Sequence, residues 1–461
     1  MFLKQYFLEC LAQSSYLIGD EVSGQAAVVD PRRDIDEYVD DAAAQGLRIA
    51  HVILTHFQAD FISGHLELRD RVGAEIHLGA RGEAEYAHTP VHDGDVLDLG
   101  DVGIVFRETP GHTVESICAL VFDRTLSETK PHAVLTGDTL FIGDVGRPDL
   151  MASKGYSAEE LAGWLYDSLH DKLLGIPDET LVYPAHGAGS LCGRNMSTDT
   201  FSTFGVQRAY NYALQPMTRE EFIEIAVADL PPSPAYFSLD AELNRKEHPF
   251  RAHEQPSSLS LAEMLSMADD GAQVLDARDA TDFAATHMRG STNIPLDGAF
   301  ALWAGSVLDF ERPIVLIVNP GGEAEVGMRL ARVGLEHVAG FLDGGMQALE
   351  EHPDLLDRTE RITARTLAEQ LSSADPPAVV DVRQRAEWVA GHIEGSINIP
   401  LGELAGRVSE LPDRAFALHC LAAYRSSIAA GILQGAGVTR FTELVGGIEA
   451  WEASKLPTVT G

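Results

Sequence analysis

Four short apolar segments in the first part of the chain each end on a side chain that can bind a metal ion. The segments are HVILTH, IVFRETPGH, HAVLTGD and LVYPAH, and they end at His56, His112, Asp138 and His186. Their composition is typical of buried β-strands. Side chains at the ends of neighbouring strands converge above a sheet, where α/β proteins place their sites. The sequence therefore predicts a metal centre built from some of these four side chains.

Two histidines and one carboxylate, with open positions on the metal, form the facial arrangement of mononuclear non-haem Fe(II) oxygenases. Catalytic zinc sites also use two histidines and a glutamate. The ligand types alone therefore leave iron and zinc open.

The stretch THFQADFISGH (55–65), with the later GHT, GD and PAH segments, resembles the metal motif of the metallo-β-lactamase fold family, T-H-x-H-x-D-H. The resemblance implies an αββα sandwich. The chain departs from the motif at Gln58 and Phe61, where the family has histidines. Phe61 cannot bind a metal ion, so a dinuclear hydrolase is not expected.

What remains of the family's first site is His56, His112 and Asp138. Persulfide dioxygenases of this superfamily use a single iron on this reduced ligand set, so the resemblance implies mononuclear Fe(II) on these three ligands, with zinc as the alternative. We then expect Asp60, His186 and Gln58 to be hydrogen-bond partners that orient the ligands. The segment GDVGRPDL (143–150) is similar to the G-R-x-D segment of the dioxygenases. This similarity implies that Arg147 binds the thiol substrate.

The four cysteines, Cys10, Cys118, Cys192 and Cys420, are too few for a disulfide framework and indicate a reducing, cytoplasmic location. Cys192 lies between glycines and precedes Arg194, which predicts a flexible, locally positive loop that lowers the thiol pKa. It also resembles the extra cysteine of multidomain sulfide-detoxifying relatives, so we expect it to be catalytic. A buried, inert cysteine is the alternative. Cys10 and Cys118 lie in apolar, strand-like contexts, where packing is expected.

The segment ALHCLAAYRSSIAAGIL (417–433) places Cys420 between an apolar strand and a helix. A helix N-terminus favours a thiolate and would stabilise an anionic persulfide. Arg425 closes the Cys-x4-Arg loop as a fixed cation. We expect Cys420 and Arg425 to be catalytic, and the neighbouring Ser426 to bind substrate.

An internal repeat precedes this loop in the sequence. Residues 274–296 align without gaps on residues 379–401, with identity at 11 of 23 positions. Both copies resemble rhodanese domains, with an Asp-x-Arg start and a G-S-x-N-I-P-L turn. The first copy has Asn319-Pro320-Gly321-Gly322 in place of the cysteine loop, and no cysteine occurs between 193 and 419. We therefore expect the first copy to be inactive in sulfur transfer.

The blocks predict three domains. Residues 1–245 form a mixed α/β unit, expected to be the iron dioxygenase domain, and the N-terminal MFLKQYFLECLAQSSYLIGD is expected to form strands, without an export signal. Residues 245–258 lose periodicity and are expected to be a linker. Residues 258–352 and 361–461 are the inactive and active rhodanese-like domains, each an α/β fold with a doubly wound parallel sheet.

Composition limits the partners. At 461 residues the chain needs several cores, and no apolar run reaches the ~20 residues of a membrane span. The net charge of −36 argues against nucleic acid or an anionic membrane. We expect a small-molecule enzyme that assembles into dimers or tetramers, as the resembled family often does.

The expected activity is oxidation by O2 of glutathione or coenzyme A persulfide to sulfite at Fe(II). Sulfur transfer by Cys420 would then give thiosulfate. Two alternatives are a zinc thioester hydrolase of glyoxalase II type and a persulfide-binding redox sensor with a vestigial metal site.

Overall fold

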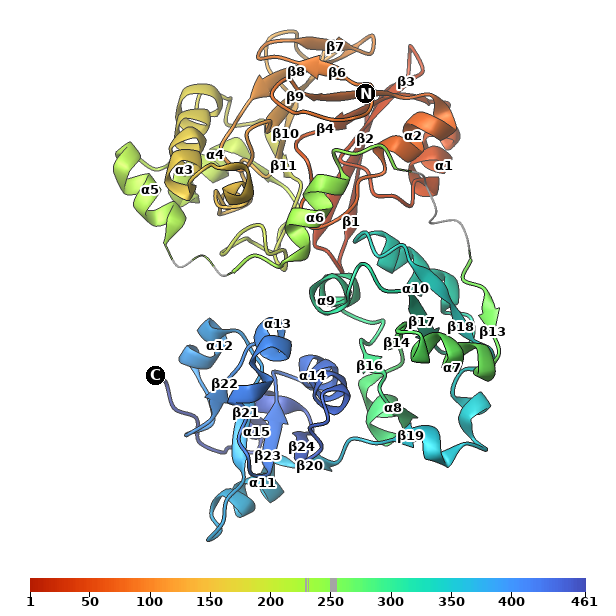
Figure 1. The fold of residues 1–461 in the computed structure, drawn as a ribbon. Helices are drawn as coiled ribbons and strands as arrows, with labels where there is room; N and C mark the ends of the chain where they lie inside the picture. The colour runs from red at the N-terminus through yellow and green to blue at the C-terminus, as the bar shows by residue number, and fades with distance from the viewer. Residues whose placement is uncertain (229, 231, 249–254) are drawn as a thin grey trace. The chain divides into compact units, whose positions relative to one another are not determined.

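A computed structural model describes residues 1–228, 230, 232–248 and 255–461. They form two compact units (Figure 1). The first holds the described residues up to 248 together with 331–334, and the second holds the others. Part of the expected linker, 249–254, lies outside the described residues.

The first unit contains two six-stranded sheets, in the orders β1-β2-β3-β4-β5-β6 and β12-β11-β10-β9-β8-β7. The expected N-terminal strands are confirmed, and β3 to β6 run parallel. The strands of the first sheet are β1 (Phe2–Leu8), β2 (Gln13–Asp20), β3 (Gln25–Val29), β4 (Arg48–Leu54), β5 (Glu75–Gly79) and β6 (Thr89–Val91). Those of the second are β7 (Val96–Asp98), β8 (Val102–Glu108), β9 (Ile117–Asp123), β10 (Ala133–Gly137), β11 (Leu181–Pro184) and β12 (Ser202–Thr203).

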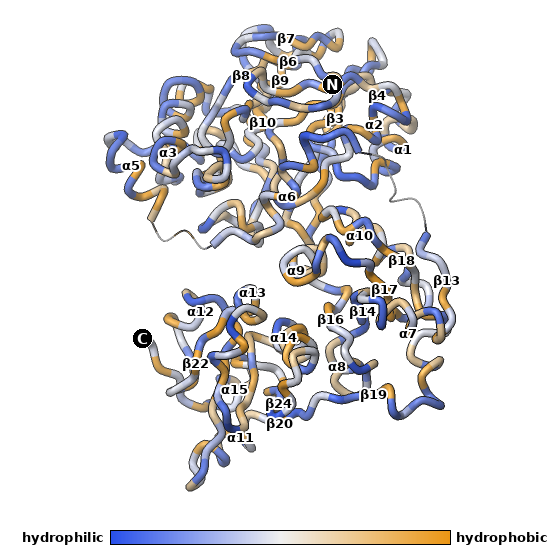
Figure 2. The backbone as a smooth tube through the Cα atoms, viewed as in Figure 1, coloured by the Kyte–Doolittle hydropathy of each residue, from blue (hydrophilic) through white to orange (hydrophobic). Residues whose placement is uncertain are grey.

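Three apolar cores separate four layers. One core lies between the two sheets and includes Ile53 and Phe106. A second packs α1 (Asp36–Ala44) and α2 (His65–Val72) on the first sheet. A third packs α3 (Ala158–Asp167), α4 (Phe204–Tyr210) and α5 (Arg219–Val227) on the second. Helix α6 (Tyr236–Leu243) follows. Figure 2 shows β9 and β10 mainly in hydrophobic colours, as the inner position requires. The expected αββα sandwich is confirmed.

The second unit contains two five-stranded parallel sheets with corresponding strand orders, β13-β18-β17-β14-β16 and β20-β24-β23-β21-β22. The repeated order confirms the repeat read from the sequence. The first sheet has β13 (Ser258–Leu259), β14 (Gln273–Asp276), β16 (Thr292–Asn293), β17 (Ile314–Ile317) and β18 (Val338–Leu342). The second has β20 (Arg361–Ile362), β21 (Ala378–Asp381), β22 (Ile397–Asn398), β23 (Phe416–His419) and β24 (Phe441–Leu444).

Helices cover both sheets of the second unit, and a short antiparallel pair, β15 (His287–Met288) and β19 (Leu356–Asp357), is added to the first copy. The helices are α7 (Leu261–Asp269), α8 (Ala280–Ala285), α9 (Phe300–Val307), α10 (Glu323–Ala331), α11 (Ala364–Leu371), α12 (Arg385–Ala390), α13 (Leu401–Leu404), α14 (Tyr424–Gly435) and α15 (Gly447–Ala453). Across the described ranges, no helix has the length and apolar character needed to cross a bilayer.

The repeated Asp-x-Arg motif builds the same buried ion pair in both copies. Arg278 Nη2 donates to Asp276 Oδ2 over 2.6 Å, and Arg383 Nη2 donates to Asp381 Oδ2 over 2.6 Å. Both carboxylates are fully buried, so a two-pronged guanidinium partner offsets their desolvation.

The repeated asparagine closes this frame in each copy. Asn293 Nδ2 donates to the carbonyl oxygens of Asp276 and Arg278 over 2.8 and 2.9 Å. Asn398 Nδ2 donates to those of Asp381 and Arg383 over 3.0 and 2.8 Å. The repeated residues therefore hold the strand ends, whether or not the copy carries a cysteine.

Candidate metal centre

Three of the predicted ligands meet at the carboxyl ends of strands in the first unit. His56 follows β4, His112 follows β8, and Asp138 follows β10. All three are buried, and their ligand atoms lie within 4.8 Å of one another. His112 Nε2 lies 3.4 Å from Asp138 Oδ2, and His56 Nε2 lies 3.8 Å from the same oxygen. The geometry therefore brings together the three ligands that the family resemblance implied.

Neighbouring groups fix both imidazoles. His112 Nδ1 donates to the carbonyl oxygen of Arg147 over 2.9 Å, which turns Nε2 toward Asp138. His56 Nδ1 lies 3.0 Å from Thr55 Oγ1. His112 Nε2 and Asp138 Oδ2 are buried without a hydrogen-bond partner in the part of the chain that the structure describes. Buried polar atoms of this kind are costly unless they are satisfied, so the donor set fits a metal ion.

The protonation states suit metal binding. Burial lowers the pKa of His56 to about 3, with Asp138 raising it and His112 lowering it further. Burial raises the pKa of Asp138, but His186, His56 and His112 outweigh this effect and hold it below its usual value. At neutral pH the pair is a neutral imidazole and a carboxylate, the forms that ligate metals.

His186 bridges two carboxylates beside this set. Its Nδ1 donates to Asp138 Oδ1 over 2.8 Å, and its Nε2 lies 3.0 Å from Asp60 Oδ2. Burial lowers the pKa of His186, but the carboxylates of Asp138 and Asp60 raise it well above the usual value. His186 thus contacts the candidate ligand Asp138 directly, and Asp60 contacts His186.

The segment that carries Gln58 and Phe61 is fully buried and is held by a residue that sequence reasoning missed. Asn244 Nδ2 donates to the carbonyl oxygens of Gln58 and Phe61, each over 2.8 Å, and Asn244 Oδ1 accepts from the Ser63 amide over 2.8 Å. The Phe61 ring packs edge-on to His186, with ring centroids 6.5 Å apart. The apolar ring of Phe61 therefore stands at the motif position where dinuclear members have a histidine ligand, as the sequence predicts.

Arg147 is buried beside the candidate ligands. Its Nε and Nη2 donate to the two carboxylate oxygens of Asp149 over 2.6 and 2.7 Å. Gly146 must be a glycine, because a Cβ there would collide with the carbonyl oxygen of Asp138 and the ring of His112. The segment therefore packs on the ligands. Asp149 forms an ion pair with the Arg147 guanidinium, the cation that we expect to bind the substrate.

Cys192 corrects one expectation. The thiol is buried and lies with Asp60 and His186 in a cluster whose ligand atoms are within 4.8 Å of one another. Burial raises the pKa of the thiol well above its usual value, and Asp60 and Asp138 raise it further. The predicted lowering of this pKa is wrong, because packing removes solvent and the effects of Asp60 and Asp138 outweigh that of Arg147. The environment favours the alternative of an inert cysteine.

Cys10 also differs from expectation, since it lies in the turn between β1 and β2 and is half-buried. Cys118 is buried in β9, as expected.

In the second unit, Cys420 follows β23 and precedes α14, as the sequence predicts. Its Sγ is buried and lies 3.7 Å from Ser426 Oγ. Between them, Ala423 adopts φ +78°, which turns the loop sharply. The backbone amide of Ile448 donates to the carbonyl oxygen of Cys420 over 2.9 Å and anchors the loop.

Two acidic residues in this loop's surroundings were missed. Glu387 pairs with Arg425 over 2.6 and 2.8 Å, so Arg425 is a fixed cation with a carboxylate partner. Glu443 is buried and accepts from Ser426 Oγ over 2.7 Å. Burial raises the pKa of Glu443, although Ser426 and Arg361 lower it. Neither acid adjoins the cysteine in sequence, so no local pattern signals it.

In the first copy, the segment Asn319–Gly322 occupies the equivalent place after β17. Residues including Asn319, Gly322, Asp279 and Pro295 line a cavity of about 190 Å³ there. The copy therefore keeps a hollow at the strand ends but offers no thiol.

Comparisons with known proteins match two kinds of domain to different parts of this chain. The Metallo-beta-lactamase superfamily model matches residues 8–186, and the Rhodanese-like domain model matches residues 260–352 and 363–454. The mitochondrial persulfide dioxygenase ETHE1 of Bos taurus is 29% identical over 224 residues, which cover 48% of this chain and 79% of the relative. The cytoplasmic hydroxyacylglutathione hydrolase of Arabidopsis thaliana is 33% identical over 187 residues, covering 40% and 67%.

Among solved structures, a metallo-beta-lactamase from Staphylococcus aureus superposes with a TM-score of 0.67 at 28% identity. The match covers 74% of this chain and 98% of that one, so it includes more than the lactamase-fold unit. The chain is therefore an enzyme of the metallo-beta-lactamase superfamily in which two rhodanese-like domains follow the lactamase-fold domain.

Proposed function

We propose that this enzyme oxidises low-molecular-weight persulfides, such as glutathione or coenzyme A persulfide, to sulfite with O2 at one Fe(II). We further propose that Cys420 couples this reaction to sulfur transfer, with thiosulfate as the final product. His56, His112 and Asp138 would hold the iron.

One observation carries the proposal. The His56–His112–Asp138 set is buried with two unsatisfied ligand atoms, while Phe61 lies against His186 where a dinuclear enzyme needs another ligand. Two histidines and one carboxylate leave positions open for two small molecules. The similarity to ETHE1, a persulfide dioxygenase, supports iron at such a site.

Iron(II), when bound, supplies the one-electron chemistry that a reaction with O2 requires. In the balance, one persulfide, one O2 and one water give one thiol, one sulfite and two protons. Asp60 and His186 hold the Asp138 carboxylate in place, and Phe61 limits the entry of water to the centre. Arg147, with Asp149, would approach the carrier thiol.

Cys420 would perform the second step. Its thiolate attacks the outer sulfur of a second persulfide, the S–S bond breaks, and the carrier leaves as a thiolate. Sulfite then attacks the outer sulfur on Cys420, releases the Cys420 thiolate and forms thiosulfate. Arg425 and Ser426 lie in the loop to meet the incoming anion, since Ser426 Oγ is 3.7 Å from Sγ.

Thioester hydrolysis at zinc is the second candidate, because the hydroxyacylglutathione hydrolase of Arabidopsis thaliana is a relative. The residues at Gln58 and Phe61 argue against it, since neither is a histidine. The centre would then have to activate water without a second ion.

The test is oxygen consumption by anaerobically Fe(II)-loaded protein given glutathione persulfide, with sulfite and thiosulfate quantified. We expect wild type to consume oxygen and release thiosulfate. Cys420→Ser should consume oxygen at a similar rate and accumulate sulfite. His112→Ala should lose iron and oxygen uptake together, by about a hundredfold or more.

Cys10→Ser is the matched control, because Cys10 is half-buried in a turn of the other unit. It should behave as wild type. No oxygen uptake by the loaded wild type would refute the dioxygenase, and zinc-dependent release of thiol from a glutathione thioester would then favour the hydrolase. A loaded protein that only retains sulfur on Cys420 would be the sensor.

We also propose the domain limits 1–245, 258–352 and 361–461, a cytoplasmic location and a dimeric or tetrameric assembly. Light scattering coupled to size-exclusion chromatography measures the assembly directly.

A further inference from the structure

A second cluster of metal-binding side chains lies on β4 and β5, away from the centre described above. His51 of β4 is the register partner of Glu75 at the start of β5, and His77 lies two residues further along β5. Because side chains alternate along a strand, Glu75 and His77 project on the same face of the sheet. The register thus gathers two imidazoles and one carboxylate.

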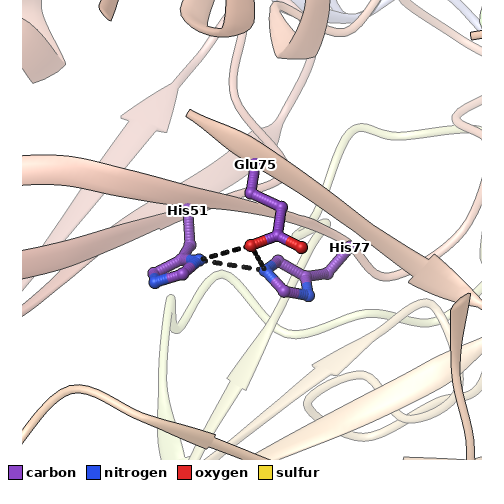
Figure 3. Close-up of side chains that lie close together, drawn as sticks. All are labelled: His51, Glu75 and His77. Atoms are coloured by element: carbon purple, nitrogen blue, oxygen red, sulfur yellow. Dashed lines mark hydrogen bonds and ion pairs between the residues drawn. The ribbon is translucent and has the colours of Figure 1, made fainter. Parts of the chain in front are cut away.

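Figure 3 shows the three side chains converging. His51 Nδ1 lies 3.0 Å from His77 Nε2, 3.8 Å from Glu75 Oε2, and the His77 Nε2 to Glu75 Oε2 distance is 4.0 Å. The His77 ring stacks near Phe106 at an interplanar angle of 20°, with centroids 6.4 Å apart, which holds it in place. Thr89 donates a hydrogen bond to the other Glu75 oxygen.

These distances are close to those of a metal site. Ligands about 2.1 Å from a tetrahedral zinc ion lie roughly 3.4 Å from each other. The two nitrogens are slightly nearer than this, and the carboxylate oxygen is slightly further away. The Glu75 side chain is half-exposed, so a small rotation brings its oxygen into reach and leaves a solvent-facing position for water.

The cluster is in the protonation state that a metal needs. Burial lowers the pKa of His77 to about 4, with His51 lowering it and Glu75 raising it. Burial also lowers the pKa of His51, with Glu75 opposing and Arg48 reinforcing the change. The hydrogen bond from Thr89 lowers the pKa of Glu75. At neutral pH both imidazoles are therefore neutral and Glu75 is ionised, so a metal ion can bind without a net release of protons from these groups.

The cluster is separate from the candidate iron centre. His56 is five positions after His51 in the chain, which corresponds to about 16 Å of extended strand. His51 is the middle residue of β4, and His56 follows the strand's carboxyl end. Neither cluster shares a ligand with the other.

We propose that His51, Glu75 and His77 bind a divalent transition-metal ion such as Zn²⁺, with water completing the coordination. Two imidazoles and a carboxylate suit Zn²⁺, Cu²⁺ and Ni²⁺ better than Mg²⁺ or Ca²⁺, which prefer oxygen ligands. The bound ion links β4 to β5 and stabilises the folded chain, because it binds the native state alone.

The test uses full-length, metal-free protein with the His112→Ala substitution, so that the first centre is weakened. Zn²⁺ is titrated by equilibrium dialysis with metal analysis, and the melting temperature is followed in parallel. Adding His51→Asn should remove one bound Zn²⁺ per chain and the zinc-dependent rise in melting temperature. Adding Glu75→Gln, at a half-exposed position, should weaken Zn²⁺ binding about tenfold or more without a risk to the core.

His92→Ala is the matched control, since His92 is an exposed histidine of the same unit, and it should leave both readouts unchanged. In protein without the His112→Ala substitution, the His51 and Glu75 variants should keep iron-dependent oxygen uptake. Equal zinc stoichiometry and melting behaviour with and without His51→Asn and Glu75→Gln would overturn the proposal. The pair His51–His77 would then be an ordinary N–H···N hydrogen bond between neutral imidazoles.

Discussion

At the scale of residues, we expect Gln58 and Phe61 to determine how many metal ions the first centre can hold. Both are buried on the segment that Asn244 fixes, next to Asp60 and His186. Replacing the pair with histidines, Gln58→His with Phe61→His, supplies two imidazoles at the positions that the family motif uses. We expect the variant to bind one metal ion more than its parent and to lose oxygen uptake by about tenfold or more.

Metal analysis after loading with Zn²⁺ measures this change. Phe61→Leu is the control, because it keeps an apolar side chain and should leave the metal stoichiometry unaltered. An unchanged metal content in the double variant would mean that the segment cannot aim histidines at the centre.

His65 provides a prediction about stability and pH. The imidazole is fully buried against Tyr86, with ring centroids 4.6 Å apart, and burial, followed by His248, lowers its pKa to about 3. In the unfolded chain its pKa is about 6.5. Between these values the unfolded state binds more protons, so the free energy of unfolding should fall as pH falls, by up to ~1.4 kcal/mol per pH unit.

His65→Phe keeps the aromatic contact and removes the titration, so its free energy of unfolding should depend less on pH between about 6.5 and 5. Urea unfolding at several pH values measures the two slopes. His92→Ala, at an exposed position, should keep the wild-type slope. Equal slopes for His65→Phe and wild type would show that His65 does not control acid sensitivity.

At the scale of elements, the start of α15 shapes the loop that carries Cys420. Gly447 adopts φ +58°, and a Cβ there would collide with the carbonyl oxygens of Cys420 and Leu421. Gly447→Ala should therefore displace the loop and reduce thiosulfate–cyanide sulfurtransferase activity by about a hundredfold. Iron-dependent oxygen uptake should persist.

Gly437→Ala is the matched control, because Gly437 has φ +79° in the same domain but nothing near its Cβ position. It should cost about 1 kcal/mol of stability and leave sulfur transfer intact. Loss of activity in both variants would point to general destabilisation and not to the loop.

The elements also show what could be predicted from the sequence. The metal ligands could be identified, because each follows a short apolar run and together they match part of the family motif. They follow strands of both sheets of the first unit. The environment of Cys192 could not, because its burial and its carboxylate neighbours come from segments distant in sequence. The same holds for Asn244, which holds a segment more than 180 residues away, and for Glu387 beside Arg425.

At the scale of the whole molecule, the two proposed steps exchange only small, diffusible compounds. A full-length Cys420→Ser chain should make sulfite from persulfide, and a full-length His112→Ala chain should transfer sulfur but not oxidise it. A mixture of the two should therefore form thiosulfate at a substantial fraction of the wild-type rate, while each chain alone should not. Thiosulfate analysis of the mixture and of each chain tests this expectation.

A mixture that fails, although each variant keeps its own half-reaction, would mean that sulfur passes between sites of one chain without release. Cys10→Ser is the control for the loss of a thiol as such. It lacks one thiol but keeps Cys420, so it should form thiosulfate without a partner variant.

The buried frame of Asp, Arg and Asn is common to both rhodanese-like copies, although only one of them has a cysteine. Its hydrogen bonds have closely similar lengths in the two copies. The hydrogen bonds that stabilise the strand ends of each copy thus lie outside the loop that determines its chemistry. A copy can therefore keep this frame with or without a cysteine in the loop, and the loop after β17 is the place where a changed sequence would cost folding little.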